Sequence, residues 1–327
     1  MISTIRSKVK ESLRLILRIG FLRACLRAVY IRESLAFPSM VQIETTNICN
    51  ARCSICPHEK LSREIGHIDT NLYRKIIDEC AGNRMHVKTI LPNHFGEPLL
   101  NPLLFEYIRY AKQKVPNSEI CIFTNGSLLN EDNSLKILES GLDVINISFD
   151  GFSKETYERI RRNLNFDQVN SNIVGFLNLK NRMKKRKPRI ELAYVEIEDN
   201  KAETEDFIKK WRGVVDKVHV GLFCNWGGAV VGKEIIGSQH LNLKRKPCTR
   251  LWSHLLIFRN GDVPLCCQDF NGEYLLGNAL RSSVGGIWHG EELNRYRQLH
   301  MKGQFEQIPI CKVCNFWKQQ GEPIWWW

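Results

Sequence analysis

Short apolar runs alternate with segments of helical periodicity through the first two thirds of the chain. Six apolar runs have the length of strands, at residues 41–45, 87–91, 119–123, 144–148, 190–195 and 218–222. Five amphipathic segments between them predict helices, at residues 71–80, 103–114, 133–139, 166–183 and 203–211. This alternation is typical of parallel βαβ units with right-handed crossovers. The pattern therefore predicts an α/β fold whose six strands form a partial barrel or an open sheet, since a closed barrel of this type has eight.

The alternation of strands and helices ends after Gly227, where a stretch rich in glycine, lysine and polar residues predicts a linker over residues 228–247. Two short apolar runs follow, at residues 255–258 and 263–267. The dipeptide Asn260-Gly261 lies between them and tolerates the positive φ angles of a tight turn, so we expect the two runs to pair as a hairpin. Residues 248–320 are thus predicted to form a second, smaller α+β module.

Composition is consistent with one large domain and an appendage, because 327 residues with 43% hydrophobic content can bury a full-sized core. The net charge is +12, and residues 1–40 carry half of it, with eight Lys or Arg against two Glu.

Lys10, Arg14 and Arg18 share one side of a helix, whereas Arg23 and Arg27 fall on nearly the opposite side. Residues 1–38 are therefore expected to form two short basic amphipathic helices. They either cover the bottom of the barrel or bind a membrane surface through residues 1–33.

The twelve cysteines indicate a reducing compartment, because three of them fall within eight residues and no secretory signal or membrane span is apparent. We therefore expect a cytoplasmic protein, with contact to the inner membrane surface left open, and no nucleic-acid partner.

The terminal segment 321–327 ends in three tryptophans. It is expected either to pack against the body of the protein or to form a tail that docks a partner or covers the substrate mouth.

Cys49, Cys53 and Cys56 form a C-x3-C-x2-C pattern directly after the first predicted strand. Three thiolates on one short loop can hold three irons of a cubane and leave the fourth iron open. Structural zinc sites normally use four ligands in two pairs, so a zinc site would need a distant fourth ligand. A [4Fe–4S] cluster is the favoured interpretation, with a zinc knuckle or unliganded thiols as the alternatives.

This segment resembles the radical S-adenosylmethionine (SAM) superfamily, and the resemblance extends over roughly residues 40–320. It implies a partial (β/α)6 TIM-type barrel at residues 39–227, with Cys49, Cys53 and Cys56 as cluster ligands. It also implies an S-adenosylmethionine molecule that chelates the open iron, and a one-electron reductant such as flavodoxin or ferredoxin. The expected product of reductive cleavage is a 5′-deoxyadenosyl radical, which abstracts hydrogen from a substrate.

Several strand ends resemble the cofactor-binding motifs of that family. Gly96-Glu97-Pro98 resembles its Gly-Gly-Glu segment, with Phe95 in place of the first glycine, and Glu97 would accept a hydrogen bond from the methionine ammonium. Ordinary turn chemistry is the alternative for the Asn-Gly and Asp-Gly pairs that follow the third and fourth strands. The cofactor-binding candidates are Ile55, Gly96, Glu97, Asn125, Ser148 and Asp150. Ile55 would contact adenine, and Ser148 and Asp150 the ribose.

Other polar residues near the strand ends are candidates for contact with cofactor or substrate, because barrel sites are built at these ends. The catalytic candidates are Tyr194, Glu196 and Asn225. The further contact candidates are Asn200, Cys224, Trp226, Arg159, Arg161 and Arg162.

A second group of cysteines follows the linker, and four of them can form a closed coordination shell for zinc or a cubane: Cys248, Cys266, Cys311 and Cys314. The spacing Gly261-x4-Cys266 followed by a C-x2-C pair resembles the SPASM/twitch extension of radical SAM enzymes. No cysteine follows Cys314, so the single-cluster twitch form, as in 2-deoxy-scyllo-inosamine dehydrogenase, is the closer resemblance. It implies a second, auxiliary [4Fe–4S] cluster. Cys267 would point to the opposite face of a strand, but it remains a substitute for Cys266.

An auxiliary cluster can take up an electron, which makes a net oxidation chemically convenient. The expected activity is oxidation or epimerisation of a carbohydrate- or cyclitol-type substrate, either a small molecule or a glycan. Two alternatives stay open. One is a maturase of ribosomally made peptides, although such enzymes often carry an added peptide-recognition domain for which this chain has no room. The other is a non-catalytic iron–sulfur or zinc-binding protein.

Overall fold

The computed structural model describes Val29, Arg32, residues 34–233 and residues 244–320. The tryptophan-rich segment 321–327 and the middle of the predicted linker lie outside the described residues, and so do the predicted basic helices of residues 1–33 except for Val29 and Arg32. In the described part of the chain, no helix is both long enough and apolar enough to cross a membrane.

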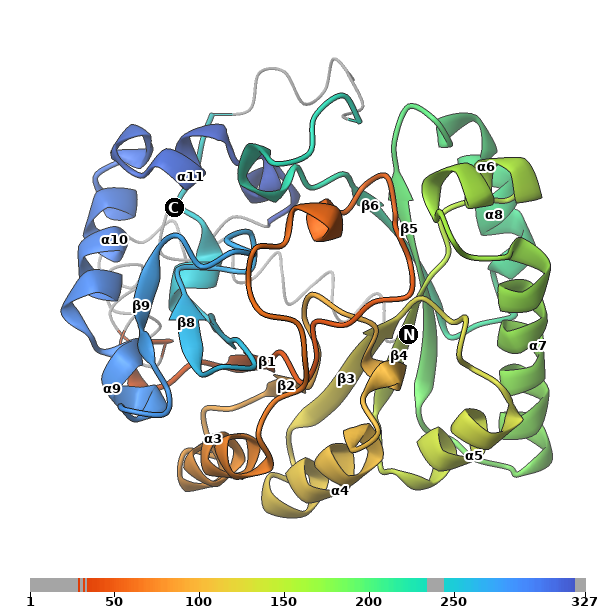
Figure 1. The fold of residues 1–327 in the computed structure, drawn as a ribbon, viewed down its shortest axis with the longest axis horizontal. Helices are drawn as coiled ribbons and strands as arrows, with labels where there is room; N and C mark the ends of the chain where they lie inside the picture. Colours follow the sequence, from red (N-terminus) through yellow and green to blue (C-terminus); the bar gives the residue numbers. More distant parts are fainter. Residues whose placement is uncertain (1–28, 30–31, 33, 234–243, 321–327) are drawn as a thin grey trace, which may run out of the picture.

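A parallel sheet of seven strands is the frame of the molecule (Figure 1). Its spatial order is β6-β5-β4-β3-β2-β1-β7. The strands are β1 Met40–Ile43, β2 Thr89–Leu91, β3 Glu119–Thr124, β4 Val144–Ser148, β5 Arg189–Glu196, β6 Lys217–Leu222 and β7 His254–Ile257. The first six confirm the predicted strands, in sequential order and within two residues of the expected bounds.

Helices cover the outer side of this sheet, as βαβ crossovers require. They are α3 Thr70–Gly82, α4 Leu104–Lys114, α5 Glu131–Glu139, α6 Lys154–Ile160, α7 Phe166–Arg182 and α8 Thr204–Trp211. Only α6 was missing from the sequence pattern. It has seven residues and is capped by the side chain of Ser153, which accepts from the backbone N–H of Thr156.

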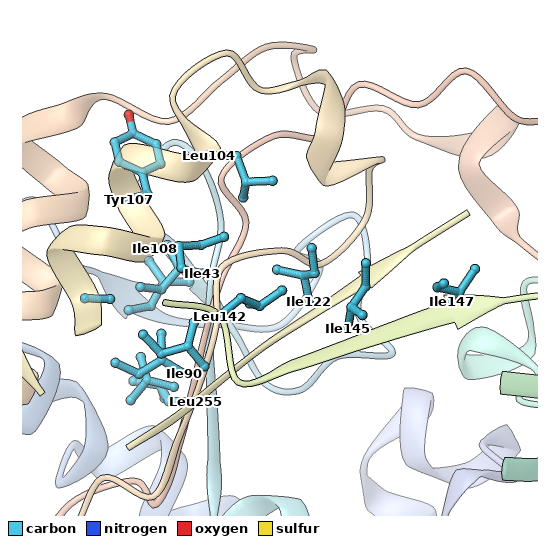
Figure 2. Packing of buried hydrophobic residues seen from close by; sticks show 14 of the residues in the cluster. Ile43, Ile90, Leu104, Tyr107, Ile108, Ile122, Leu142, Ile145, Ile147 and Leu255 are labelled. Carbon is cyan, nitrogen blue, oxygen red and sulfur yellow. The ribbon is translucent and has the colours of Figure 1, made fainter. Parts of the chain in front are cut away.

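The core lies between the strands and these helices (Figure 2). Ile43, Ile90 and Ile122 of three neighbouring strands are fully buried, as are Leu104 and Ile108 of α4. Branched aliphatic side chains on a buried strand fix its register, because a shift by one residue would turn them to the other face. The positions of the loops at the carboxyl ends of the strands follow from this register.

The seventh strand corrects the expected hairpin. β7 pairs in parallel with β1, from Met40 opposite His254 to Ile43 opposite Ile257. The tight turn is present, with a hydrogen bond of 2.8 Å from the backbone N–H of Phe258 to the carbonyl of Asp262. The chain then leaves the sheet, and β8 (Asp262–Pro264) pairs antiparallel with β9 (Leu275–Asn278). All four residues of β7 are buried, which is typical of a strand inside a parallel sheet.

Three short helices complete the C-terminal module: α9 Val284–Trp288, α10 Glu291–Met301 and α11 Pro309–Val313. Figure 1 shows this module in blue beside β1. Because β7 belongs to the barrel sheet, the module is joined to the barrel by backbone hydrogen bonds as well as by side-chain packing.

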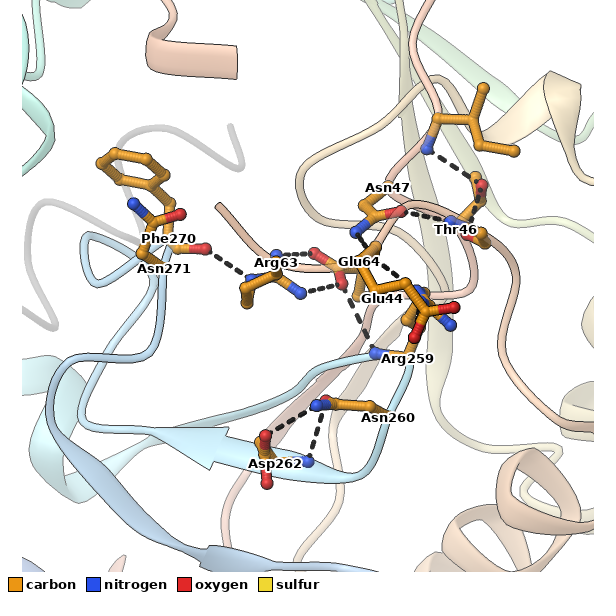
Figure 3. Close-up of polar contacts among 12 residues, drawn as sticks. Glu44, Thr46, Asn47, Arg63, Glu64, Arg259, Asn260, Asp262, Phe270 and Asn271 are labelled. Carbon is orange, nitrogen blue, oxygen red and sulfur yellow. Dashed lines mark hydrogen bonds and ion pairs between the residues drawn. The ribbon is translucent and has the colours of Figure 1, made fainter. Parts of the chain in front are cut away.

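A buried ion pair strengthens this junction (Figure 3). Two parallel bonds of 2.6 and 2.7 Å join the guanidinium of Arg63 to the carboxylate of Glu44, which directly follows β1. Arg63 also donates from Nε to the carbonyl of Phe270 at 2.7 Å and stacks on the ring of Phe258 at 3.6 Å from its centroid. A single side chain therefore holds the end of β1 against two loops of the C-terminal module.

Arg63→Met should lower the free energy of unfolding by about 3–5 kcal/mol, because it leaves the Glu44 carboxylate buried without its partner. The side chains of Glu44 and Arg63 are 0% and 10% exposed. Lys136→Met is the matched control, since its ion pair with Asp132 is 50% and 71% exposed and should contribute less than about 1 kcal/mol. Chemical denaturation of both variants measures the difference, and equal losses would contradict the assigned role of the pair.

Candidate active site

The carboxyl ends of the barrel strands open onto a cavity of about 410 Å³. Its walls come from the cysteine loop after β1, the ends of β2–β6 and the C-terminal module. The residues predicted from sequence that line it are Cys49, Cys53, Ile55, Cys56, Gly96, Glu97, Asn125, Ser148, Arg161, Tyr194, Cys224 and Trp226. The fold thus brings most of the expected cofactor site to one place.

The cysteine loop is held by the end of α6. The backbone N–H groups of Arg52 and Ser54 donate to the carbonyls of Arg162 and Ile160 at 2.9 and 2.8 Å. Burial raises the pKa of Cys49 to about 11 and that of Cys56 to about 12. Burial thus opposes ionisation of Cys49 and Cys56 unless positive charge compensates it. Iron supplies that charge, so the set fits a cluster that holds its ligands as thiolates.

Gly96 brings the loop after β2 against the cysteine loop. A Cβ atom at this position would lie 2.6 Å from the carbonyl oxygen of Ile48 and 2.7 Å from that of Thr46. The next backbone N–H, of Glu97, donates to the carbonyl of Ile48 at 2.8 Å. Only glycine permits this approach, which places the Glu97 carboxylate beside the cysteines.

Glu97 is buried and held by three donors. Its Oε1 accepts from Thr124 Oγ1 at 2.7 Å and from the N–H of Leu99 at 3.2 Å, and its Oε2 accepts from the N–H of Asn125 at 2.7 Å. Burial raises the pKa of Glu97 to about 6, although the three hydrogen bonds lower it in part. The carboxylate is therefore ionised at neutral pH. Oε2 retains accepting capacity, which suits an ammonium group in the cavity.

Asn125 mainly stabilises the position of Glu97 relative to the cysteine loop. Its Nδ2 donates to Asn50 Oδ1 at 2.8 Å, and its Oδ1 accepts from the hydroxyl and the backbone N–H of Ser127 at 2.7 and 2.9 Å. Asn50 belongs to the cysteine loop. The Asn-Gly pair after β3 therefore joins the cysteine loop to Glu97 rather than serving only as a turn.

The expected contact of Asp150 with ribose stays a prediction, and the structure gives this carboxylate partners within the protein. Asp150 is buried, does not line the cavity, and forms an ion pair with Arg161. Its other oxygen accepts from the backbone N–H of Val195 at 2.6 Å. Strand β4 ends at Ser148, so the alternation that put Ser148 and Asp150 on one side does not continue. Asp150 positions Arg161, whose Nη1 lies 3.5 Å from Cys53 Sγ.

The three catalytic candidates have structural partners. The hydroxyl of Tyr194 donates to the carbonyl of Asn200 at 2.6 Å, although its ring lines the cavity. Glu196 accepts from Thr204 Oγ1 at 2.8 Å, and Asn225 donates to the carbonyl of Val313 at 2.8 Å. Neither Glu196 nor Asn225 lines the cavity. The position of a polar residue at a strand end predicts that it lies near the cavity, but it does not reveal the partner that the side chain takes.

The remaining contact candidates fall into two groups. Trp226 lines the cavity, and its indole Nε1 donates to the carbonyl of Ile55 at 3.0 Å, so it holds the cysteine loop. Asn200, Arg159 and Arg162 lie outside the cavity lining and bond to backbone carbonyl groups.

Sequence reasoning missed several residues that line the cavity: His94, His219, Gln268, Phe316 and Gln319. His94 lies in the loop that follows β2. Its Nε2 is buried without a hydrogen-bond partner in the described part of the chain, and burial lowers its pKa to about 3. The histidine is therefore neutral and free to bond to a bound molecule. Its position at a strand end was the signal that could have identified it.

A second cavity lies within the C-terminal module. Cys248, Cys266, Cys267, Cys311 and Cys314 all line it. Among the described residues, no three or more His, Cys, Asp or Glu side chains converge to hold a single metal ion. In a cubane each thiolate binds a different iron, so its ligands do not converge on one point. Cys267 packs with Leu256, Phe258 and Phe316, and both Cys266 and Cys267 remain within reach of the cavity.

Comparison with known protein families agrees with the geometry of both cavities. Residues 43–174 match the model of the radical SAM superfamily, and residues 248–315 match the SPASM model, an iron–sulfur cluster-binding domain. The chain therefore contains a radical SAM domain and a SPASM domain. Its cofactors are accordingly [4Fe–4S] clusters and S-adenosylmethionine.

Two relatives illustrate how far the similarity extends. The 2-deoxy-scyllo-inosamine dehydrogenase of Niallia circulans, which is S-adenosylmethionine-dependent, is 20% identical over 85% of this chain and 92% of that protein. The GTP 3′,8-cyclase of Chlorobaculum tepidum is 36% identical, but over only 39% of this chain and 38% of that protein. The higher identity to the cyclase is thus confined to part of each protein.

Solved structures share the fold of this radical SAM protein. BtrN in complex with AdoMet and 2-DOIA has a TM-score of 0.59 at 19% identity, covering 85% of this chain and 93% of that one. Streptococcus suis SuiB bound to the precursor peptide SuiA has a TM-score of 0.62 at 15% identity, covering 87% and 71%. At these identities the likeness concerns the fold alone.

Gly96→Ala should lower the free energy of unfolding by about 1–3 kcal/mol, because the new methyl group would be forced against two backbone carbonyls. It should also weaken S-adenosylmethionine binding, since Glu97 would move with its loop. Gly82→Ala is the control, because no atom outside its own helix lies within 4 Å of the added methyl group. Thermal unfolding and anaerobic calorimetry measure both effects, and a Gly96→Ala protein as stable as Gly82→Ala would refute the close approach.

Proposed function

We propose that this radical SAM protein is an oxidoreductase-type enzyme that abstracts hydrogen from a carbohydrate- or cyclitol-type alcohol and oxidises or epimerises it. The similarity to the Niallia circulans dehydrogenase, which spans nearly all of that protein, supports an alcohol substrate. The chemistry of the two cavities supports a net oxidation.

The observation that carries the proposal is the position of Gln268. This buried side chain lines both the strand-end cavity and the cavity of the C-terminal cysteines. Its Oε1 accepts from Cys224 Sγ at 2.6 Å, and its Nε2 lies 3.7 Å from Cys267 Sγ. A substrate in the first cavity would therefore be one side chain away from the second cluster. Such proximity favours removal of an electron from the substrate.

The ligand sets follow from the two groups of cysteines. We assign the catalytic cluster to Cys49, Cys53 and Cys56, and the auxiliary cluster to Cys248, Cys266, Cys311 and Cys314. When bound, the catalytic cluster and S-adenosylmethionine supply a 5′-deoxyadenosyl radical that can take a hydrogen atom from carbon.

The residues of the chain bind and orient this cofactor. Glu97 accepts a hydrogen bond from the methionine ammonium, and Asn125 keeps Glu97 in place. Ile55 gives the adenine an apolar contact, and Ser148, half-buried at the cavity wall, is a candidate for the ribose. Arg161 places a positive charge 3.5 Å from Cys53 Sγ, on the wall of the cavity.

A peptide substrate is the second candidate. The fold of SuiB, which is similar to this chain, has been solved with a precursor peptide bound. A non-catalytic binding protein fits less well, because Glu97 is a buried carboxylate without a cationic partner among the described residues. A protein without a cationic ligand would gain nothing from burying that charge.

The proposed partners and location follow from the same chemistry. A flavodoxin or ferredoxin would deliver the electron, and the free thiols are suited to the cytoplasm. Contact with the inner membrane surface through residues 1–33 is proposed from the basic amphipathic sequence alone.

Anaerobic reconstitution tests the proposed function. The protein should hold about eight iron atoms, the content of two four-iron clusters. The Cys49→Ala/Cys53→Ala/Cys56→Ala variant should keep half of that iron and release no 5′-deoxyadenosine. Panels of sugars, cyclitols and peptides, assayed by chromatography for 5′-deoxyadenosine and product, would identify the substrate class. Stoichiometric zinc without iron in the wild type would refute the proposal, and turnover of peptides alone would favour the second candidate.

Glu97→Gln should weaken S-adenosylmethionine binding about tenfold or more, because a hydrogen bond to a charged group contributes about 1.5–3 kcal/mol. Glutamine keeps an oxygen for the N–H of Asn125 and can donate to the Thr124 hydroxyl, so it loses only the longer bond from the N–H of Leu99. Iron content should therefore stay unchanged and the melting temperature should fall only slightly. Anaerobic calorimetry measures the affinity. Wild-type affinity in this variant would remove Glu97 from the binding site.

A further inference from the structure

His300, on α10, lies between two of the cysteines assigned to the auxiliary cluster. Its Nδ1 is 3.1 Å from the backbone N of Cys248, and its Nε2 is 3.5 Å from Cys311 Sγ. The side chain is buried, and its ring packs edge-on against Phe305 with the centroids 5.1 Å apart. The imidazole is therefore held by contacts on several sides in one orientation.

The hydrogen bond from Cys248 decides the tautomer of this histidine. A backbone N–H can only donate, so Nδ1 must carry its lone pair toward Cys248. The ring proton then resides on Nε2, the atom that faces Cys311. A cluster-bound cysteine is a thiolate with no proton of its own, so the contact is an N–H donor directed at a sulfur acceptor.

We propose that His300 donates a hydrogen bond from Nε2 to the Cys311 thiolate and thereby raises the reduction potential of the auxiliary cluster. The inference rests on the proposed function, in which Cys311 is a cluster ligand. Reduction adds a negative charge to the cluster, and a donor to a ligand sulfur stabilises the more negative state. Because the contact is buried, its electrostatic effect is stronger than it would be in water.

The surroundings of the other cysteines point in the same direction. Gln320 Nε2 lies 3.2 Å from Cys248 Sγ, and the backbone N–H of Phe316 lies 3.3 Å from Cys314 Sγ. Arg245 lines the cavity, and its Nε is buried without a hydrogen-bond partner among the described residues. The C-terminal cavity thus supplies donors to several sulfurs, and His300 is the only histidine among the described residues that line it.

A raised potential suits the proposed oxidation. An alcohol that becomes a ketone loses one hydrogen atom to the 5′-deoxyadenosyl radical and then one proton and one electron. The electron must go to an acceptor, and the auxiliary cluster is one, provided that its potential is high enough. His300 is in this sense a positioning residue, since it acts on the cluster through Cys311 and touches no substrate.

Redox titration of the auxiliary cluster alone tests the proposal. In the Cys49→Ala/Cys53→Ala/Cys56→Ala background, His300→Phe should lower the equilibrium constant for reduction about tenfold, or 59 mV for a one-electron couple. His300→Gln, whose Nε2 can donate in the same place, should stay closer to the parent. His289→Phe is the control, because His289 Nε2 bonds to the carbonyl of Leu35 and does not line the cavity. An intact cluster with an unchanged potential in His300→Phe would overturn the proposal.

A second measurement needs no substitution of His300, because it uses only the parent protein, which is the Cys49→Ala/Cys53→Ala/Cys56→Ala variant. Pulsed electron paramagnetic resonance on the reduced parent protein, with nitrogen-15 in its histidines, should show a weak nitrogen coupling to the auxiliary cluster. No coupling would overturn the proposal, and so would a strong coupling, which is typical of a histidine bound directly to iron. If the parent holds no second cluster at all, the ligand assignment under the proposed function fails instead.

Discussion

The pairing of β1 with β7 determines how the two halves of this protein are placed. β1 lies between β2 and β7, and the cysteine loop begins just beyond its end. β7 leads into the module that carries the other cysteines. The separation of the two cysteine sites is therefore set by backbone hydrogen bonds within one sheet, and the ion pair between Glu44 and Arg63 strengthens the same junction.

Buried ionisable groups gather at the strand-end cavity and directly behind its wall. Glu97, the cysteine thiols and the pair of Asp150 with Arg161 lie around one loop. Burial opposes ionisation of the carboxylate and the thiols alike. Such a site is incomplete by itself, and iron together with a cationic ligand would satisfy it. The close approach at Gly96 keeps these groups together before any cofactor binds.

The frame of the fold and the identity of both cysteine sites could be predicted from the sequence, because both have local signals. Strands and helices have different periods, and the spacing of the cysteines is a motif. β7 was assigned to the wrong partner because a strand buried on both faces carries no alternation, and its neighbour in the sheet is some 210 positions away in the chain. Asp150 and His300 depend on contacts with distant residues, so no pattern along the chain could define their roles.

The side chain of Gln268 lies between the two cavities and lines both of them. A substitution there would change the shape offered to a substrate and, at the same time, the medium through which an electron passes. Substrate preference and electron-transfer rate are therefore coupled at this position, and selection cannot adjust one without disturbing the other. Descendants of this protein with a new substrate would be expected to retain the residue, or to replace it together with its neighbours in both cavities.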